Sequence, residues 1–483
     1  MSEPSLRNTT IKGVGWSFTD GILSKGVIFL VGIVLARLLS PEEYGLIGIL
    51  MIFIVVSESI VNSGLSSALI RKQEATEEDF STVFITNLIL SFVMYGVLFL
   101  CAPLISTFFE RPQLTILLRV MGVIVIINAL SLVPLAKLTR NIDFKSITIC
   151  SFSSAIVSGA VGISMAFIGY GVWSLVGQQI SKQLTYTLAL WIVNKWLPKL
   201  QFSTDSFKEL WGFGWKLLVS GLIDTIWREI YKVVIGKFYT PATLGQYTQA
   251  HQYSDLFSSN LTSVIQRVSY PVLSKIQNER ERLKQAYRQV IKVTMLVTFV
   301  FMFGLAGCAE SFIYVLIGEQ WLPCVPYLQI LCFSMALYPL HAINLNMLQV
   351  QGRSDLFLKL EIIKKFIAIC PLLLGIFIDI YWMLIGSVIV GWFAYYLNAY
   401  YSGPYLNYSV YAQIKDILPS MSLALGMAAV VFLIGLIPLS PYALLPIQTI
   451  TGAIIVFAVC ESFKLDEYMQ IKDIALGIIK KRK

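Results

Sequence analysis

The sequence predicts an all-α polytopic membrane protein, with two parallel six-helix repeats around a central cavity and two additional C-terminal helices. Three observations lead to this prediction: the composition, the recurrence of apolar stretches of spanning length, and a pair of matching segments in the two halves of the chain. Of the 483 residues, 56% are hydrophobic and 13% are charged, whereas soluble domains carry about 25% charged residues. The composition therefore favours a chain that lies almost wholly within a membrane.

Apolar stretches of about twenty residues, the length that crosses a bilayer core, recur along the whole chain and predict about fourteen transmembrane helices. No connection between them is long enough to hold a soluble domain. The basic, hydrophilic stretch 274–289 predicts a separate amphipathic helix at the membrane interface. The expected spans are 13–38, 44–68, 81–109, 113–136, 146–169, 171–193, 208–236, 243–268, 286–317, 322–348, 355–378, 380–402, 416–437 and 442–461.

Two matching segments indicate an internal duplication. Gly13–Trp16 returns as Gly212–Trp215, and Arg37–Gly45 returns as Lys237–Gly245, with the same Ser/Thr-Pro pair and closing glycine. Six spans per copy is an even number, so both copies enter the membrane in the same direction and form parallel repeats. The expected divisions are an N-terminal six-helix lobe at 1–200, a C-terminal six-helix lobe at 201–403, and two additional helices with a basic cytoplasmic tail at 404–483.

The basic residues fall mainly in alternate connections and in the last residues of the chain, which places both termini in the cytoplasm. This placement explains the net charge of +9 without a nucleic-acid partner. The chain has two histidines and no acidic or thiol cluster at metal-ligand spacing, and it lacks a nucleotide-binding phosphate loop. The sequence therefore predicts a protein that is not an enzyme, with no catalytic residues, no metal and no cofactor.

Charged residues inside the predicted spans point to a functional site, because a charge at bilayer depth is costly and normally faces a cavity, a partner or a pathway. Most of these charges lie in spans that are equivalent between the two repeats. The basic candidates for binding an anionic cargo are Lys25, Lys182, Lys216, Arg228, Lys232 and Arg267. The acidic candidates for coupling transport to an ion gradient are Asp20, Glu58, Asp224 and Asp255.

Some of these charges also have simpler explanations. Asp224 and Arg228 are four positions apart on one helix and can neutralise each other. Lys216 and Lys232 lie nearer the ends of their span, where a long side chain can reach the interface. For these residues the cavity and the structural interpretations both stay open.

Polar residues at helical spacing in the span 243–268 predict a face that is turned to water or to a polar ligand, because such a stripe cannot face lipid. Together with lysine and arginine, amide and hydroxyl groups suit an anionic, hydroxyl-rich cargo. The members of the stripe are Gln249, Gln252, Asp255, Ser259, Thr262 and Gln266.

Eight short motifs, taken in their order and spacing, resemble the Wzx-type polysaccharide flippases, and among them the WzxC-like branch. The similarity runs across nearly the whole chain and implies membership of the multidrug/oligosaccharidyl-lipid/polysaccharide exporter (MOP) superfamily. The motifs are Ala36–Gly45, Gly64–Lys72, Ser81–Phe84, Asp143–Lys145, Gly171–Leu175, Leu244–Tyr247, Pro271–Lys275 and Gly352–Asp355.

The resemblance implies two lobes around a V-shaped cavity and a cargo of undecaprenyl-pyrophosphate that carries an oligosaccharide repeat unit. Alternating access would move this cargo from the cytoplasmic to the periplasmic leaflet of a bacterial inner membrane, for exopolysaccharide, capsule or lipopolysaccharide biosynthesis. The pyrophosphate would bind among the intramembrane lysines and arginines. The implied partners are membrane lipid and the polymerase and chain-length proteins of the same pathway, and the sequence leaves open whether H⁺ or Na⁺ is coupled.

Two alternatives from other functional classes stay open. One is a cation-coupled multidrug exporter of the same fold, and the other is a membrane glycan polymerase or ligase. Polymerases and ligases usually present a large periplasmic loop with catalytic Arg or His, and none of the connections here has that length.

Overall fold

A computed structural model of the chain describes residues 6–199 and 201–473. These residues form α-helices and two short 3₁₀ helices, which confirms the all-α class predicted from the sequence. Within these ranges, some side chains lie outside the description, namely those of residues 6–15, 17–22, 264, 267, 268, 270, 271 and 354.

The chain forms two compact units, Met1–Gly245 and Gln246–Lys483, and each is described by itself. The first unit contains α1 (Leu6–Leu38), α2 (Pro41–Asn62), α3 (Leu65–Arg71), α4 (Glu77–Phe109), α5 (Leu114–Met121), α6 (Val123–Arg140), α7 (Phe144–Ile168), α8 (Val172–Asn194) and α9 (Thr204–Phe238). Helix α10 (Pro241–Lys275) begins in the first unit and continues into the second.

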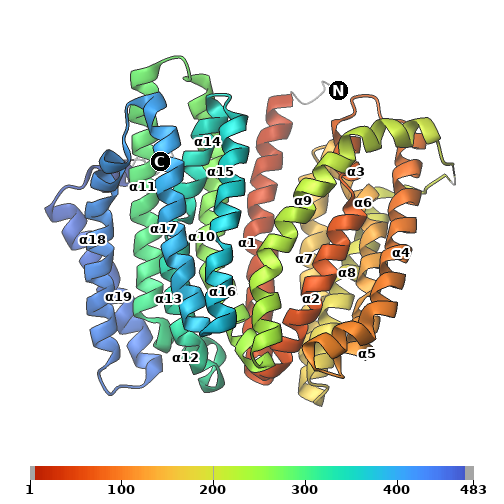
Figure 1. Cartoon of the computed structure of the whole chain (residues 1–483), viewed down its shortest axis with the longest axis horizontal. Helices are drawn as coiled ribbons and strands as arrows, with labels where there is room; N and C mark the ends of the chain where they lie inside the picture. Colours follow the sequence, from red (N-terminus) through yellow and green to blue (C-terminus); the bar gives the residue numbers. More distant parts are fainter. Residues whose placement is uncertain (1–5, 200, 474–483) are drawn as a thin grey trace. The chain divides into compact units, whose positions relative to one another are not determined.

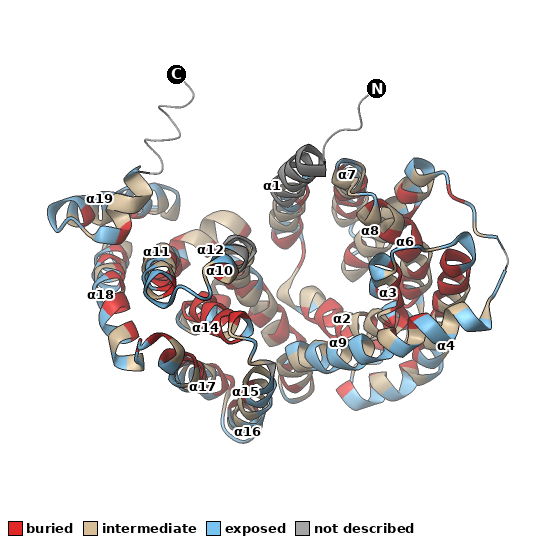
Figure 2. Cartoon of the chain, turned by 90° about the horizontal axis from the view of Figure 1, so that it is seen from above, coloured by how far each residue is buried: buried red, intermediate tan, exposed pale blue. Residues whose placement is uncertain are grey.

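The second unit continues through a series of longer and shorter helices. They are α11 (Arg280–Gly307), α12 (Ala309–Ile317), η1 (Glu319–Cys324), α13 (Val325–Met335), α14 (Tyr338–Val350), α15 (Ser354–Ile367), α16 (Ile369–Phe377), α17 (Ile380–Ser402), η2 (Gly403–Leu406), α18 (Val410–Gly435) and α19 (Pro441–Ser462). In Figure 2 buried residues gather on α14, which packs against α11, α15 and α17.

The first unit extends beyond residue 200, where the repeat pattern places the start of the second lobe. The reason is that α9 packs against α2, α3 and α4 (Figure 1). The six-helix lobes at 1–200 and 201–403 therefore stay a prediction about the repeats, whereas the compact units divide after Gly245.

Nine helical segments of the described chain are long and apolar enough to cross a membrane. They confirm a multi-pass membrane protein, and the total of about fourteen spans stays a prediction from span length. The segment Glu77–Phe109 is a clear example, because its most apolar window has a mean hydropathy of 2.5 and only 17% of that window is buried inside the protein.

The prediction of a separate interfacial helix over residues 274–289 was wrong. Helix α10 runs to Lys275 and α11 begins at Arg280, so these residues form the ends of two long helices. The hydrophilic side chains serve to fix α11: Arg280 donates to Asn407 Oδ1 at 3.1 Å, and Arg288 forms an ion pair with Asp416 on α18.

The two matching Ser/Thr-Pro motifs begin their helices in the same way. Ser40 Oγ accepts a hydrogen bond from the backbone of Glu43 at 3.4 Å, and the Glu43 carboxylate accepts one from the Ser40 backbone at 2.7 Å. Thr240 Oγ1 accepts from the backbone of Thr243 at 3.2 Å. Both copies therefore satisfy the unpaired donors of a helix N-terminus with a side-chain cap.

The closing glycines of these motifs allow the two helix starts to pack on each other inside the first unit. A Cβ atom on Gly45 would lie 1.8 Å from the carbonyl oxygen of Pro241, and one on Gly245 would lie 1.9 Å from that of Pro41. Each glycine thus makes room for the proline of the other copy. The two duplicated motifs therefore contact each other reciprocally in the folded chain.

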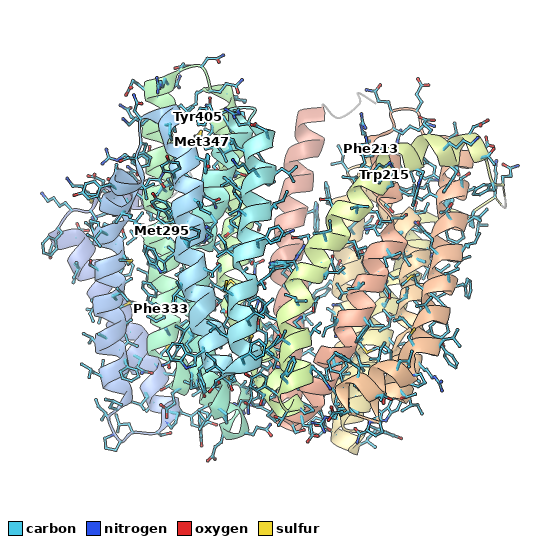
Figure 3. The ribbon with its side chains drawn as sticks, viewed as in Figure 1. Phe213, Trp215, Met295, Phe333, Met347 and Tyr405 are labelled. Atoms are coloured by element: carbon cyan, nitrogen blue, oxygen red, sulfur yellow. The ribbon has the colours of Figure 1, made fainter. Side chains whose placement is uncertain are left out.

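A second close approach interrupts the predicted span 44–68. The chain turns at Gly64, whose φ is +68°, and a Cβ atom there would lie 2.3 Å from the carbonyl oxygen of Gly214. Figure 3 shows the neighbours of that glycine, Phe213 and Trp215, near the N-terminal part of α9. The break between α2 and α3 therefore exists because α9 crosses this point backbone to backbone.

Candidate functional site

Three polar side chains meet inside the first unit, at positions well inside their helical segments. Glu58 lies on α2, Asn128 on α6 and Lys182 on α8, and these three helices pack against one another. The Asn128 side chain is hydrogen-bonded to the Glu58 carboxyl, and Lys182 lies within electrostatic range of the same carboxyl. We call this group the Glu58 cluster (Glu58, Asn128 and Lys182).

A set of hydrogen bonds beside the cluster holds α6 against α8. Thr187 Oγ1 donates to the carbonyl oxygen of Ile127 at 3.1 Å, and Gln183 Nε2 contacts Ser131 Oγ at 3.5 Å. Ser131 Oγ in turn donates to the carbonyl oxygen of Asn128 at 2.7 Å. These bonds fix α8, the helix that carries Lys182, against α6.

The sequence predicts Lys182 as a cargo-binding cation and Glu58 as a coupling group, in separate roles. The structure brings them within electrostatic range of each other. Asn128 was not predicted, because a single amide in the apolar stretch 113–136 carries no charge that would mark it. An asparagine within a span still signals a polar contact, since a buried amide requires hydrogen-bond partners.

Two of the predicted charges lie on α1. Lys25 is exposed on this helix, which packs along α7. The side chain of Asp20 lies outside the described part of the structure. The structure therefore tests neither the cargo-binding role predicted for Lys25 nor the coupling role predicted for Asp20.

Four charges of α9, between Asp224 and Lys232, are paired within that helix. Arg228 Nη2 donates to Asp224 Oδ2 at 2.6 Å, and both side chains are exposed. Lys232 Nζ donates to Glu229 at 2.8 Å in a pair that is mostly buried. Lys216 is exposed. Asp224 and Arg228 therefore neutralise each other, as one of the two interpretations from the sequence proposed. The sequence analysis did not identify Glu229 as the partner of Lys232.

The polar stripe of α10 is narrower than the sequence predicts. Gln249 and Thr262 are 3% and 5% exposed, so these two residues point into the protein and the prediction for them was wrong. Gln252 is exposed, and Asp255 accepts a hydrogen bond from Ser259 Oγ. The side chain of Arg267, a predicted cargo-binding residue, lies outside the described part of the structure.

Several basic residues of the connections hold the ends of the helices in the first unit. Lys72 Nζ donates to Glu209 at 2.9 Å and to Asp79 at 3.1 Å, and Arg140 donates to the backbone carbonyl oxygens of Leu69 and Lys72. The hydrogen bond to Glu209, and then that to Asp79, raises the pKa of Lys72 above its ordinary value of 10.5, against the opposing effect of partial burial. These cations therefore have a structural role outside the bilayer.

Charges on α15 were also missed by the sequence-based prediction of the site. Lys364 forms an ion pair with Glu361, and Lys365 follows directly in the sequence. All three are half-buried. They fall inside the predicted span 355–378, so a count of charges over every span, including those outside the repeat-equivalent pairs, could have found them.

The second unit contains an apolar pocket of about 580 Å³ between α11, α12, α18 and α19. Its walls are made chiefly of aliphatic and aromatic side chains, and Gly304 of α11 and Gly452 of α19 also line it. Among the described residues, no group of three or more His, Cys, Asp or Glu side chains could hold a metal ion. Because its lining is apolar, the pocket is suited to a flexible hydrocarbon chain.

Comparison with known proteins places this arrangement in context. Residues 34–326 match the family model described as "Polysaccharide biosynthesis protein". The succinoglycan biosynthesis transport protein ExoT of Rhizobium meliloti (strain 1021) is 28% identical over 326 residues, which are 68% of this chain and 66% of that protein. The lipopolysaccharide biosynthesis protein WzxC of Escherichia coli (strain K12) is 23% identical over 77% of this chain and 76% of its own length.

The fold is shared with a solved flippase structure. The lipid II flippase MurJ, in an inward closed conformation, superposes with a TM-score of 0.72 over 94% of this chain and 99% of that chain, at 16% sequence identity. At this identity the likeness concerns the fold. The resemblance identified from the sequence motifs is confirmed by these matches.

Proposed function

This chain belongs to the polysaccharide biosynthesis protein family, and we propose that it is a flippase for undecaprenyl-pyrophosphate-linked oligosaccharides. The cargo would cross from the cytoplasmic to the periplasmic leaflet of a bacterial inner membrane by alternating access. ExoT is named for succinoglycan biosynthesis transport and WzxC for lipopolysaccharide biosynthesis, and the fold is shared with the lipid II flippase MurJ. These matches support the proposal.

The observation that carries the proposal is the Glu58 cluster. A lysine inside a predicted span that lies within electrostatic range of one carboxylate forms a site for an anion that can exchange partners. When the pyrophosphate approaches Lys182, its oxygens compete with the Glu58 carboxylate for the ammonium group. Glu58 is then released, and it becomes available to take up a proton or a sodium ion.

The other predicted charges would act around this centre. Lys25 and Lys216 are exposed and would guide the anionic headgroup, with Arg228, Lys232 and Arg267 as further cations along its path. When the pyrophosphate binds Arg228, Asp224 would be released in the same way that Glu58 is released from Lys182. Asp20 and Asp255 are the remaining proposed coupling groups.

The apolar pocket of the second unit would receive part of the undecaprenyl chain. Its aliphatic and aromatic lining offers favourable contact to an isoprenoid and none to a sugar. Gly452→Phe would fill the pocket from the α19 side. We expect this change to slow the movement of undecaprenyl-linked cargo more than that of the same headgroup on a short lipid chain, measured side by side in proteoliposomes.

The test of the proposed function follows a fluorescent undecaprenyl-pyrophosphate oligosaccharide in proteoliposomes. Wild-type protein is expected to make the label accessible to an external quencher, and Lys182→Gln to slow this by about tenfold or more, because a hydrogen bond to a charged group contributes about 1.5–3 kcal/mol. The matched control is Lys195→Gln, since Lys195 is an exposed lysine just past the end of the same helix.

Three results would count against the proposal. Equal rates for wild type and Lys182→Gln would move the cargo site away from the Glu58 cluster. A wild type that leaves the lipid-linked cargo in place under H⁺ and Na⁺ gradients, but extrudes organic cations, would make the chain a drug exporter. Elongation of the oligosaccharide in place of its translocation would make it a polymerase or ligase.

A further inference from the structure

The helix that carries Lys364 and Lys365 is interrupted in the middle of a span-length segment. Helix α15 ends at Ile367 and α16 begins at Ile369, and Pro371 in the first turn of α16 has no backbone N–H to continue the hydrogen-bond pattern. The sequence predicts a span over residues 355–378. With a rise of about 1.5 Å per residue, Lys365 lies about 16 Å from the start of α15, which in that span is near the middle of a hydrocarbon core of about 30 Å. Interrupted helices at this depth commonly form substrate sites in transporters.

Three faces of α15 have different surroundings. Leu358, Ile362 and Phe366 are 61%, 48% and 69% exposed and form an apolar stripe that suits lipid. On the packed side, the helix contacts α14 and α17, and Leu360 is fully buried. Between these two sides lies a half-buried polar face made of Glu361, Lys364 and Lys365. Because three charges cannot face hydrocarbon, this face is turned to a polar space.

The charges on this face do not balance. Lys364 is paired with Glu361, and their side chains are 16% and 33% exposed. Lys364 is also within electrostatic range of His341 on α14, whose ring contacts Asn398 at 3.4 Å. Lys365 has no hydrogen-bond or ion-pair partner among the described residues of the chain. Within the described part of the chain, the polar face of α15 therefore carries one positive charge without a counter-ion.

We propose that Lys365, beside the Glu361–Lys364 pair, forms a second oxyanion-binding site, located in the C-terminal unit, for the cargo of the proposed flippase. The inference rests on the proposed function, because that function supplies a ligand that carries oxyanions. The shared chemistry is a negatively charged oxygen, from the pyrophosphate or from a carboxylate on the glycan. An ammonium group without a counter-ion at bilayer depth lowers stability, and an anionic ligand compensates for that cost when it binds.

The experiment compares two cargoes in proteoliposomes: an undecaprenyl-pyrophosphate-linked neutral trisaccharide, and the same trisaccharide with one glucuronic acid. Lys365→Met is expected to lower the rate for at least one of them by about tenfold or more, as loss of a charge-assisted hydrogen bond predicts. Lys365→Arg keeps a donor cation and is expected to retain most of the rate. Lys359→Met is the matched control, because Lys359 is exposed and lies nearer the start of the same helix.

The two cargoes identify the source of the oxyanion. Loss for both cargoes assigns the site to the pyrophosphate, and loss for the glucuronate cargo alone assigns it to the glycan carboxylate. Unchanged rates for both cargoes in Lys365→Met would overturn the proposal. So would a rate loss that is accompanied by a lower thermal midpoint and is not rescued by Lys365→Arg, because that pattern describes a structural lysine.

A stability measurement separates the site from the proposed function. Removal of an unpaired intramembrane charge is expected to leave the thermal midpoint of Lys365→Met unchanged or higher than that of the wild type. If the wild type moves neither cargo, the flippase proposal fails. The oxyanion site is then tested by a second measurement. The thermal midpoint of detergent-solubilised protein is measured with inorganic pyrophosphate and with the free glucuronate trisaccharide. A midpoint shift with either ligand that Lys365→Met abolishes supports the site, and the same shifts in both proteins overturn it.

Discussion

Each unit of the protein contains a lysine–carboxylate pair within its helical segments, and the two pairs are built differently. In the N-terminal unit, Glu58 and Lys182 come from α2 and α8, and Asn128 on α6 adds a hydrogen bond to the carboxyl. In the C-terminal unit, Glu361 and Lys364 lie three positions apart on α15. The first pair exists only when α2 and α8 are packed, whereas the second forms within one helix.

This difference teaches how a bound anion would act in each unit. An anion that binds Lys182 would weaken an electrostatic attraction between α2 and α8, so cargo binding would change the interaction between two helices as well as the charge. An anion that binds Lys365 leaves the Glu361–Lys364 pair and the packing of α15 in place. We therefore expect the N-terminal site to couple binding to conformational change, and the C-terminal site to hold cargo passively.

The largest effect is expected from Lys182→Met. This change removes the proposed cargo cation and leaves Glu58 without a nearby positive charge. We expect it to lower the free energy of unfolding, by less than the about 3 kcal/mol that is the lower end for a broken buried ion pair. Transport of the lipid-linked oligosaccharide should fall at least about tenfold. Both are measured on purified protein, as a thermal midpoint in detergent and as a flipping rate in proteoliposomes.

The double variant Glu58→Gln with Lys182→Met separates these two effects. Neutralising both partners removes the uncompensated charge, so the thermal midpoint should return close to the wild-type value. The flipping rate should stay low, because the cation that binds the pyrophosphate is still missing. Recovery of the flipping rate in the double variant would mean that Lys182 serves only to neutralise Glu58.

The next effect in size is expected from Asn128→Leu, which keeps side-chain volume and removes the hydrogen bond to Glu58. Loss of such a bond costs about 1 kcal/mol, and a less firmly held Glu58 should lower the flipping rate by a few-fold. Ser131→Ala is the control, because Ser131 lies on the same helix and bonds to the carbonyl oxygen of Asn128. Equal effects of the two changes would assign Asn128 to helix packing alone.

The sequence was enough to predict the all-helical membrane class and the charges of the Glu58 cluster, because a carboxylate or ammonium group inside an apolar stretch is conspicuous. It did not reveal that Glu58 and Lys182 are partners, since they are far apart in the chain and helix packing alone brings them together. Asn128 carries no charge and escaped notice for that reason. Long-range pairing depends on tertiary contacts that periodicity along one chain does not contain.

Where sequence reasoning failed, the cause was a tertiary contact that reassigned polar residues. The stretch 274–289 is hydrophilic and predicts an interfacial helix. In the structure its last residues belong to α11, where Arg288 forms an ion pair with Asp416 on α18. On α10, helical spacing puts Gln249 and Thr262 on the predicted polar stripe, but packing buries both. A polar residue of a membrane helix can therefore face protein as readily as water when a partner is present.

A smaller effect is expected from Glu361→Gln in the C-terminal unit. The pair lies within one helix, where such pairs contribute about 0.2–0.5 kcal/mol, so the thermal midpoint should change far less than in Lys182→Met. The flipping rate should stay the same or rise slightly, because Lys364 then becomes available to the anion beside Lys365. A large loss of stability would show that the two lysine–carboxylate pairs are equally important for packing.

The smallest effect is expected outside the bilayer, at Lys72, whose charge is satisfied by Glu209 and Asp79. Its pKa is raised above 10.5 in the folded protein, so its contribution to stability is complete below that pH and is lost as the pH rises through the folded-state pKa. The thermal midpoint of Lys72→Gln should therefore lie slightly below that of the wild type near pH 8, and the difference should shrink near pH 11. A difference that is the same at both pH values would assign the effect to packing of the aliphatic part of Lys72. Lys72 and its two carboxylate partners would then differ from the two intramembrane pairs, for which we expect the charge to determine the effect.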